Sequence, residues 1–358
     1  MPRLDLTAGA VDLTRAICDI PSVSGDEAML ADAIFEAIDG CAHLEVYRDG
    51  DTIVARTNLG RAQRVVIAGH IDTVPINANL PVREVDQDGE PYLWGRGTVD
   101  MKGGTAVQLK LAAELADPRV DVTWMWYDNE EVDAERNGLT RLARTRPDLF
   151  AANFAILGEP SNGQVEGGCN GTMRIVARTH GVRSHSARAW MGENAIHAAA
   201  PILQRLAEYR PREIEVEGLV YREGLNAVGI SGGVAGNVIP DLCEVSINYR
   251  FAPSRSLDEA EAHVRGVLDG FELEIVDRAA GARPGLDAAL AQEFIAAVGA
   301  QPRPKYGWTD VARFSALGVP AVNYGPGDPS LAHHDHERVS YRQIEDVERG
   351  LRAWLTAP

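Results

Sequence analysis

The spacing of apolar positions along the chain separates predicted helices from predicted strands. Between residues 10 and 39 the apolar positions form two helix-like groups, which a Pro-Ser-Val-Ser-Gly turn at residues 21–25 interrupts. Short β-branched runs and one further helical stretch follow. The predicted strands are residues 52–56, 65–68, 121–127 and 154–157, and the predicted helix is residues 105–115. Strands that alternate with helices at this spacing predict an α/β layer with a largely parallel sheet.

The middle of the chain has a different order of elements. Strands are predicted at residues 172–178, 228–231, 244–251 and 271–276, and helices at 195–208 and 257–268. The order βαββαβ is typical of a compact, ferredoxin-like α+β sheet with helices on one face. We therefore interpret residues 172–281 as an inserted second domain, and residues 1–171 with 282–358 as the first domain. After the insertion, the sequence of the first domain predicts a helix at 287–298, a strand at 321–324 and a closing helix at 341–355.

Composition and charge narrow the classes of function. The 358 residues include 35 Lys and Arg against 52 Asp and Glu, which gives a formal charge of −17. At roughly 150 residues per domain, this length fits two domains. Because so large an excess of acids repels phosphate groups, we expect no nucleic acid and no membrane as a partner.

The spacing of the cysteines and the first residues of the chain indicate the cellular compartment of the protein. The N-terminal residues carry acids early and lack the basic and apolar regions of a secretory signal. No apolar run approaches the roughly 18 residues that a membrane span needs. The four cysteines, at positions 18, 41, 169 and 243, lie far apart and are most simply reduced thiols. We therefore expect a cytoplasmic protein.

Polar residues with metal-binding chemistry follow two of the apolar runs. The strand in VVIAGHIDTVP ends in His70 and Asp72, which share a face at i and i+2, so that the carboxylate can orient the imidazole. The glycine-rich segment LWGRGTVDMKGG presents Asp100 just before a helix, and its two oxygens can bridge two cations. Each motif alone is weak, since solvated strand ends and helix starts commonly carry such residues.

Three more motifs of this kind follow along the chain. The run VTWMWYDNEEV is expected to carry Glu130 and Glu131 on an extended strand, where neighbours point to opposite sides and one can bind metal while the other acts as base. Glu159 ends the strand of FAILGEP, and a late loop carries a histidine cluster that begins at His333. Strand ends converge on one crevice in an open α/β sheet. A two-metal site is therefore preferred over five unrelated solvated patches.

The motifs GHIDTVP, GRGTVDMKGG, the Glu-Glu pair, GEP and the late histidine resemble, in order and spacing, the family of co-catalytic zinc peptidases, aminoacylases, acetylornithine deacetylases and desuccinylases. In detail, segments such as GEPSNGQVEGGCNGT and YREGLNAVGISGGVAGNVIPD are most similar to actinobacterial desuccinylases of lysine and diaminopimelate biosynthesis. The resemblance covers nearly the whole chain. It implies a zinc-peptidase-like catalytic domain with a mixed, mostly parallel sheet, and an inserted lid and dimerisation domain.

The resemblance also implies roles for individual residues. One Zn²⁺ would be held by His70 and Glu159, a second by Glu131 and His333, with Asp100 bridging them, Asp72 orienting His70 and Glu130 as the base. Co²⁺ or Mn²⁺ are expected substitutes. Family members often have a cis peptide after the bridging aspartate. The family spacing H-x-x-[ND]-E runs from His333 to Glu337, but His336 replaces the usual Asn or Asp, which leaves His334 and His336 as alternative ligands.

The inserted domain supplies the remaining candidates. The resemblance implies that His185 stabilises an oxyanion in the partner subunit of a homodimer, and that Asn237 and Arg250 hold a substrate carboxylate together with Thr309 from a loop of the catalytic domain. The implied reaction is hydrolysis of N-succinyl-LL-2,6-diaminopimelate to succinate and LL-2,6-diaminopimelate by water activated at two zinc ions.

Three functions are alternatives to this reaction. An acetylornithine deacetylase, or another N-acyl amino acid hydrolase or carboxypeptidase, would share the metal ligands. A catalytically silent binding protein is disfavoured by the intact set of ligands with Glu130. A glycosidase is disfavoured because adjacent carboxylates that diverge from one strand cannot flank a glycosidic bond.

Overall fold

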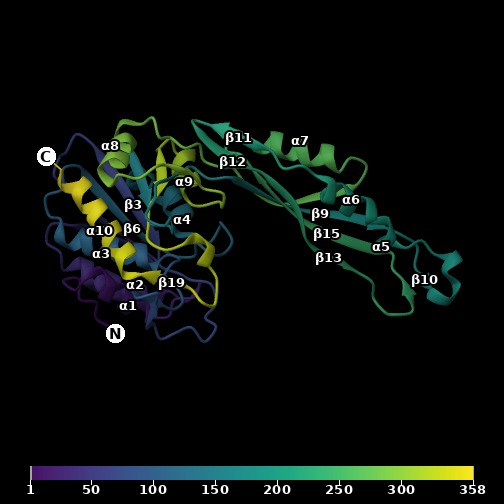
Figure 1. The fold of residues 1–358 in the computed structure, drawn as a ribbon, viewed down its shortest axis with the longest axis horizontal. Helices are drawn as coiled ribbons and strands as arrows, with labels where there is room; N and C mark the ends of the chain where they lie inside the picture. Colours follow the sequence, from purple (N-terminus) through teal and green to yellow (C-terminus); the bar gives the residue numbers. More distant parts are fainter. Residues whose placement is uncertain (1, 358) are drawn as a thin grey trace. The chain divides into compact units, whose positions relative to one another are not determined.

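A computed structural model describes residues 2–357 of the chain (Figure 1). The chain divides into two units. The first contains residues up to 167 together with Pro284–Arg303 and the chain from Arg313 onward, and the second contains Gly168–Arg283 together with Pro304–Ala312. Each unit is described by itself below.

A mixed sheet forms the centre of the first unit. In sheet order its strands are β1 (Glu45–Asp49), β2 (Thr52–Arg56), β6 (Asp121–Tyr127), β3 (Arg64–His70), β7 (Phe154–Leu157), β18 (Ala321–Asn323), β8 (Glu166–Gly167) and β17 (Arg303–Pro304). The four central strands β6, β3, β7 and β18 are parallel, whereas β1, β2 and β8 pair antiparallel. The mixed, mostly parallel sheet expected from the sequence is confirmed.

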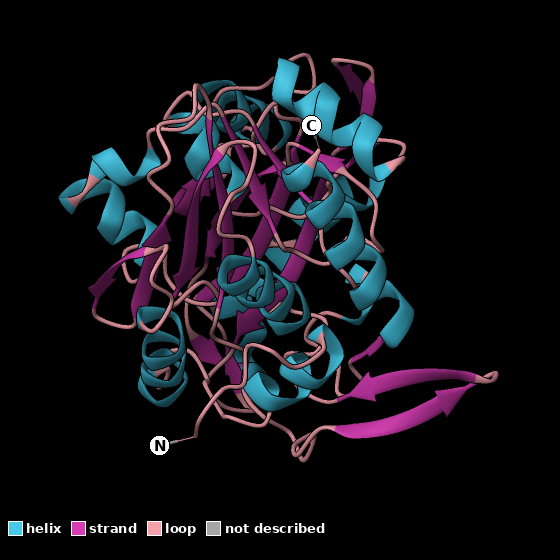
Figure 2. Cartoon of the chain, turned by 90° about the vertical axis from the view of Figure 1, so that its left-hand side faces the viewer, coloured by secondary structure: helices cyan, strands magenta, loops and turns pink. Residues whose placement is uncertain are grey.

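Helices cover this sheet, and in Figure 2 its magenta strands lie between cyan helices. One face packs in a single apolar core against α1 (Ala10–Cys18), α2 (Ala28–Asp39), α3 (Lys102–Glu114), α8 (Ala289–Val298) and α10 (Tyr341–Thr356). Val65 and Ile67 point into this core, and the alternate residue Val66 is equally buried. Burial on both faces explains why these strands are continuous apolar runs rather than alternating ones.

Shorter elements complete the first unit. They are α4 (Gly138–Thr145), the 3-10 helices η1 (Pro147–Phe150) and η3 (Pro329–Leu331), and a small sheet of β4 (Arg83–Gln87), β5 (Glu90–Trp94) and β19 (Arg338–Ser340). Helix α9 (Val311–Ala316) begins in the second unit and continues into the first. The hairpin of β4 and β5 was not predicted, because its residues are mostly polar and show no clear apolar alternation. Its turn carries Asp88 and Gly89 at φ 56° and 84°, and this Asp-Gly pair is the signal that could have revealed it.

An antiparallel sheet forms the second unit, in the order β13 (Gly224–Gly232), β15 (Leu242–Phe251), β9 (Gly171–His180) and β16 (Glu272–Ala279). One face packs against α6 (Ala200–Glu208) and α7 (Leu257–Val267). Burial alternates along β15, as expected for a sheet with one covered face. A capping box of Ser256 and Glu259 begins α7, as its Ser-x-x-Glu spacing favours.

The helix expected at 195–208 is broken, which corrects the sequence prediction. It divides into α5 (Ala195–Ala198) and α6. Pro201, near the start of α6, has no N–H to continue the helical ladder. The remaining elements of this unit are η2 (Ser186–Met191), the pair β11 (Glu213–Val216) and β12 (Leu219–Arg222), and the pair β10 (Ser184–His185) and β14 (Val238–Ile239).

Among residues 2–357, no helix combines the length and the apolar character that crossing a bilayer would require.

Candidate metal centre

His70 is the last residue of β3 and is fully buried. Its Nδ1 lies 3.0 Å from the backbone oxygen of Asp72 and 3.5 Å from a carboxylate oxygen of the same residue. Because both neighbours only accept, Nδ1–H donates and fixes the tautomer. The other nitrogen, Nε2, is directed to Asp100, whose Oδ1 lies 3.1 Å away. This arrangement presents Nε2 as a metal ligand with a carboxylate behind the ring.

Asp100 is presented by a loop that two buried side chains hold. Glu337 accepts hydrogen bonds from the backbone N–H groups of Val99 at 2.8 Å and Asp100 at 3.0 Å. Its second oxygen accepts from Arg96 at 2.9 Å, and both side chains of this ion pair are at most 4% exposed. The peptide bond from Asp100 to Met101 is cis, as the resemblance implied. The loop that carries Asp100 is thereby tied to the loop that follows His333.

Glu130 and Glu131 do not lie on a strand, which corrects the expectation. Strand β6 ends at Tyr127, and the two glutamates follow in a turn. Asn129 has φ 58°, a left-handed conformation that Asn tolerates better than most residues and that ends the extended chain. The alternation of neighbours on a strand therefore does not explain how the two side chains diverge. Instead, the backbone N–H groups of Glu130 and Glu131 both donate to the Asp72 carboxylate, at 3.0 and 3.1 Å.

Of the three late histidines, His333 is the one that reaches this cluster. Its Nε2 lies 2.9 Å from Glu131 Oε1 and 3.3 Å from Asp100 Oδ2. His334 accepts a hydrogen bond from the backbone of His336 at Nδ1, and within residues 2–357 neither of these two side chains contacts Asp100 or Glu131. The geometry therefore favours His333 over the two alternatives.

Glu159 follows β7, the strand beside β3 in the sheet. The pairing of Ala68 with Leu157 continues as a 3.0 Å hydrogen bond from Gly158 N–H to Ala68 O, so Glu159 leaves the sheet at the same edge as His70. Glu159 is 6% exposed. A Cβ on Gly158 would lie 2.5 Å from Gln108 Nε2 and 2.8 Å from the Met101 methyl, so only glycine allows this close approach of α3.

The residues present fit a metal centre. One ligand atom each from His70, Asp100 and Glu131 lie within 4.8 Å of one another, and His333 adds a second imidazole. Imidazoles and carboxylates are the ligands that Zn²⁺ binds in catalytic sites. The nearby cations are engaged elsewhere, since Arg96 pairs with Glu337 and buried Lys102 donates to the backbone oxygens of residues 17 and 20. The carboxylates of the cluster are left to offset the charge of a bound cation.

The carboxylates around His70 and His333 raise the pKa values of both imidazoles. Burial opposes the charged imidazole of His70, but Asp100 and Asp72 outweigh it and raise the pKa of His70 well above its usual range. Hydrogen bonds to Asp100 and Glu131 raise the pKa of His333 to about 10. Burial alone would raise the pKa of Asp100, yet His333 and His70 hold it far below its usual range. The metal-free centre therefore carries a protonated His333 at neutral pH.

Metal binding should therefore release protons even at pH 8. An ordinary histidine has lost its proton at that pH, whereas His333 must give up a proton before it can bind a cation, so roughly one proton or more should appear per chain. Calorimetric titration of the metal-free protein with Zn²⁺ in buffers of different ionisation enthalpy measures this number. The variant His333→Ala should release fewer protons. Identical heats in all buffers would contradict the prediction.

Replacing Glu337 with glutamine should lower metal affinity by about 10–100-fold, the usual effect of losing a group that holds a ligand in place. Glutamine keeps one acceptor oxygen but ends the ion pair with Arg96. Competition with a chromophoric chelator measures the affinity, and thermal unfolding recorded in parallel shows whether the fold persists. The matched control is Glu345→Gln, because Glu345 is exposed on α10. Equal affinities for the two variants would refute this role of Glu337.

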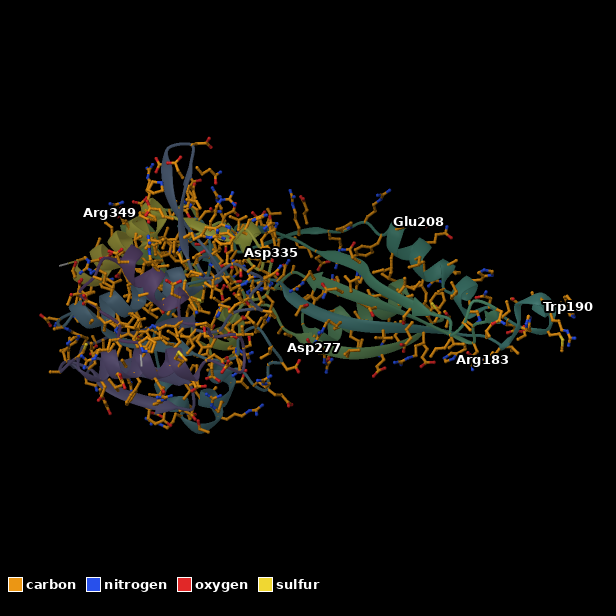
Figure 3. The ribbon with its side chains drawn as sticks, turned by 90° about the horizontal axis from the view of Figure 1, so that it is seen from below. Arg183, Trp190, Glu208, Asp277, Asp335 and Arg349 are labelled. Atoms are coloured by element: carbon orange, nitrogen blue, oxygen red, sulfur yellow. The ribbon has the colours of Figure 1, made fainter. Side chains whose placement is uncertain are left out.

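The remaining candidate residues lie in the second unit, and they are His185, Asn237, Arg250 and Thr309. His185 pairs with Val238 across β10 and β14, and the N–H of Ser186 donates to the backbone oxygen of Asn237 at 2.9 Å, so His185 and Asn237 are neighbours. Both are exposed. They belong to the same end of this unit as Arg183 and Trp190, which Figure 3 labels.

Arg250 and Thr309 lie elsewhere in the second unit. Arg250 is on β15, and its Nε donates to Asn248 at 3.2 Å. Burial lowers the pKa of Arg250. Thr309 is 5% exposed and lies in the segment Pro304–Ala312, which groups with the second unit rather than with the first. Its backbone oxygen accepts from Cys169 Sγ at 3.7 Å.

Four supporting residues were not assigned a role from the sequence, namely Ser24, Glu27, Arg96 and Glu337. Their contacts with the centre come from loops distant in sequence, and their types are common at the surface. The spacing from His333 to Glu337 was the one available signal. It marked Glu337 as part of a motif without indicating what it holds.

The chain is similar to a known family of peptidases and to named desuccinylases. Residues 66–357 match the sequence profile described as peptidase family M20/M25/M40. The Mycobacterium tuberculosis protein named DapE is 52% identical, over 98% of this chain and 99% of its own. The succinyl-diaminopimelate desuccinylase of Corynebacterium glutamicum is 47% identical, over 99% of this chain and 98% of its own.

Solved structures show the same fold at low sequence identity. A tripeptidase of Staphylococcus aureus has a TM-score of 0.79 at 20% identity, with 98% of both chains covered. The Bacillus subtilis protein YXEP, described as a dinuclear metal-binding peptidase of the M20 family, has a TM-score of 0.71 at 16% identity, with 97% of this chain and 96% of that chain covered. The chain therefore belongs to peptidase family M20/M25/M40, a family of metal-dependent hydrolases.

Proposed function

We propose that this protein hydrolyses N-succinyl-LL-2,6-diaminopimelate to succinate and LL-2,6-diaminopimelate. The observation that carries the proposal is the gathering of His70, Asp100, Glu131 and His333 beside Glu130, in a chain that aligns end to end with named desuccinylases. Such an enzyme would act in the cytoplasm, where the four free cysteines stay reduced.

The ligand assignment of the proposal uses five residues. His70 and Glu159 would hold one Zn²⁺, Glu131 and His333 a second, and Asp100, which lies between the two histidines, would serve both. Bound zinc supplies Lewis-acid chemistry, since it lowers the pKa of a bound water to about 7 and polarises a carbonyl. Asp72 keeps His70 oriented through Nδ1 and so acts through that ligand.

Glu130 is the proposed general base. It directly precedes Glu131, whose carboxylate lies in the cluster of ligand atoms with His70 and Asp100. A carboxylate in this position can accept the proton of the attacking water and later deliver it to the departing amine nitrogen, a role that contributes about 10²–10⁴-fold to the rate.

His185 is proposed to stabilise the oxyanion of the tetrahedral intermediate across a homodimer. Its Nδ1 accepts a hydrogen bond from the backbone N–H of Ala187 at 3.0 Å. The neutral imidazole must then carry its proton on Nε2, so this nitrogen is a hydrogen-bond donor without needing a positive charge. A donor of this kind suits an oxyanion better than a ring with the other tautomer.

The substrate carboxylates are assigned to Arg250, Asn237 and Thr309. Among residues 2–357, the Arg250 guanidinium has no carboxylate partner, although it is half-buried. Leaving a guanidinium in this state is costly unless an anion completes its hydrogen bonds, and a carboxylate matches its planar fork. This supports a substrate with carboxylates at its ends.

Activity on three substrates tests the proposal. The zinc-loaded protein should show the highest kcat/KM with N-succinyl-LL-2,6-diaminopimelate, compared with N-acetylornithine and N-succinylornithine. The first comparison varies both acyl group and amine, and the second keeps the succinyl group constant. A preference for acetylornithine would favour the deacetylase alternative, and a preference for succinylornithine would show that the amine side had been misassigned.

A further inference from the structure

Hydrogen bonds join the loop before α2 to the segment that carries Asp72. Val23 and Thr73 form a parallel bridge. The N–H of Ser24 donates to Thr73 O at 3.1 Å, and the N–H of Thr73 donates to Ser22 O at 2.9 Å. The side chain of Ser24 donates to Asp72 Oδ2 at 2.7 Å. This loop precedes the residues that match the family profile, which begin at residue 66.

Two buried carboxylates from these segments hold three successive amides of the turn that carries the proposed base. Glu27 Oε1 accepts from the N–H of Asn129 at 3.1 Å. Asp72 accepts from the N–H of Glu130 through Oδ1 and from that of Glu131 through Oδ2. Glu27 and Asp72 are 1% and 0% exposed. A turn with three consecutive amides fixed has little freedom left in its backbone.

The side chain of Glu27 is not explained by its place at the start of a helix. Glu27 is the residue before α2, but it has helical backbone angles, φ −88° and ψ −11°, and its carboxylate makes no capping hydrogen bond to that helix. Burying a carboxylate is costly unless its oxygens are hydrogen-bonded. The carboxylate is instead directed to Asn129, whose positive φ of 58° turns the chain toward Glu130.

We propose that Glu27 is a positioning residue for Glu130. Together with the Asp72 carboxylate that Ser24 orients, it fixes the backbone from which the Glu130 side chain departs. Glu27 acts through the backbone of the turn and touches neither the substrate nor the ligands. This inference rests on the proposed function, since it assumes that Glu130 is the base.

Three variants of the loop test the proposal in the full-length, zinc-loaded protein with N-succinyl-LL-2,6-diaminopimelate. Glu27→Leu removes the acceptor of the Asn129 amide at similar volume. Glu27→Gln keeps an acceptor oxygen. Asp26→Asn is the matched control, because Asp26 is an exposed acid one residue away. Zinc content, kcat, KM and thermal unfolding are measured for each, with Glu130→Gln alongside.

A misplaced catalytic group can lower the rate by about 10²-fold. Glu27→Leu should therefore lower kcat by about tenfold to 10²-fold, with KM and zinc content close to those of the parent protein. Glu27→Gln should recover most of the rate, and Asp26→Asn should equal the parent. This pattern separates positioning from a general loss of folding, which would reduce zinc content or the fraction of folded protein instead.

Two results would overturn the proposal. If Glu27→Leu keeps the parental kcat while Glu130→Gln is inactive, Glu27 has no positioning role and the proposed function stands. If Glu27→Leu loses zinc together with activity while its thermal unfolding stays parental, Glu27 supports the metal ligands rather than the base. Parental turnover by Glu130→Gln would instead remove the proposed base itself, whatever the behaviour of Glu27.

Discussion

Replacing Glu130 with glutamine should lower kcat by about 10²–10⁴-fold, the contribution of a general base, while zinc content stays at the parental value. The substitution removes proton acceptance but keeps the size of the side chain. The proposed ligand of this pair is its neighbour Glu131, which lies in the cluster of ligand atoms with His70 and Asp100. Steady-state kinetics with N-succinyl-LL-2,6-diaminopimelate and elemental analysis of the same preparation measure both quantities.

The control for Glu130 comes from its own loop. Glu135→Gln makes the same chemical change at an exposed position and should leave both kcat and metal content unchanged. If Glu130→Gln loses zinc, the assignments of base and ligand to the two adjacent glutamates must be exchanged.

His185→Ala should lower kcat by about 10²–10³-fold, as removal of one well-placed oxyanion donor does, without changing metal content. His185 lies in the second unit, apart in sequence from every proposed ligand, so the metal ions should bind as before. His197→Ala, which removes an exposed histidine of the same unit, is the control and should retain full activity.

Mixing two inactive variants tests whether the site is shared. In a mixed dimer of His185→Ala and Glu130→Gln chains, one site would combine an intact Glu130 with the His185 of the partner. Activity should therefore reappear when the two proteins are allowed to exchange subunits. Without any recovery, His185 would have to act within its own chain or not at all.

The fold could be predicted from the sequence where apolar runs were long. Strand β6 matches residues 121–127 exactly as expected, and the closing helix α10 begins at the predicted Tyr341. The site could be predicted from the positions of the strand ends rather than from apolar runs. The parallel strands β3 and β7 end at one edge of the sheet, so polar residues that follow them converge whatever lies between them in sequence.

The rest depended on contacts that no local pattern encodes. The sequence pattern predicts a strand that continues through Asn129, whereas the chain turns there, because hydrogen bonds to Glu27 and Asp72 hold the left-handed conformation of this residue and the turn that follows it. Glu27 and Glu337 resemble ordinary surface acids in the sequence. Their role becomes visible only when loops distant in sequence meet and bury them.

The two ends of the inserted segment lie against each other. Cys169 and Ala282 form an isolated antiparallel bridge, in which each N–H donates to the other's oxygen at 3.0 Å. Because the insertion Gly168–Arg283 enters and leaves at one point, its exchange leaves the path of the host chain unchanged. The segment Pro304–Ala312, which groups with the insertion, is the part of the host chain that must adapt to it. Evolution can therefore vary the residues proposed to bind substrate, such as Arg250 and Asn237, while the proposed metal ligands in the other unit are inherited unchanged.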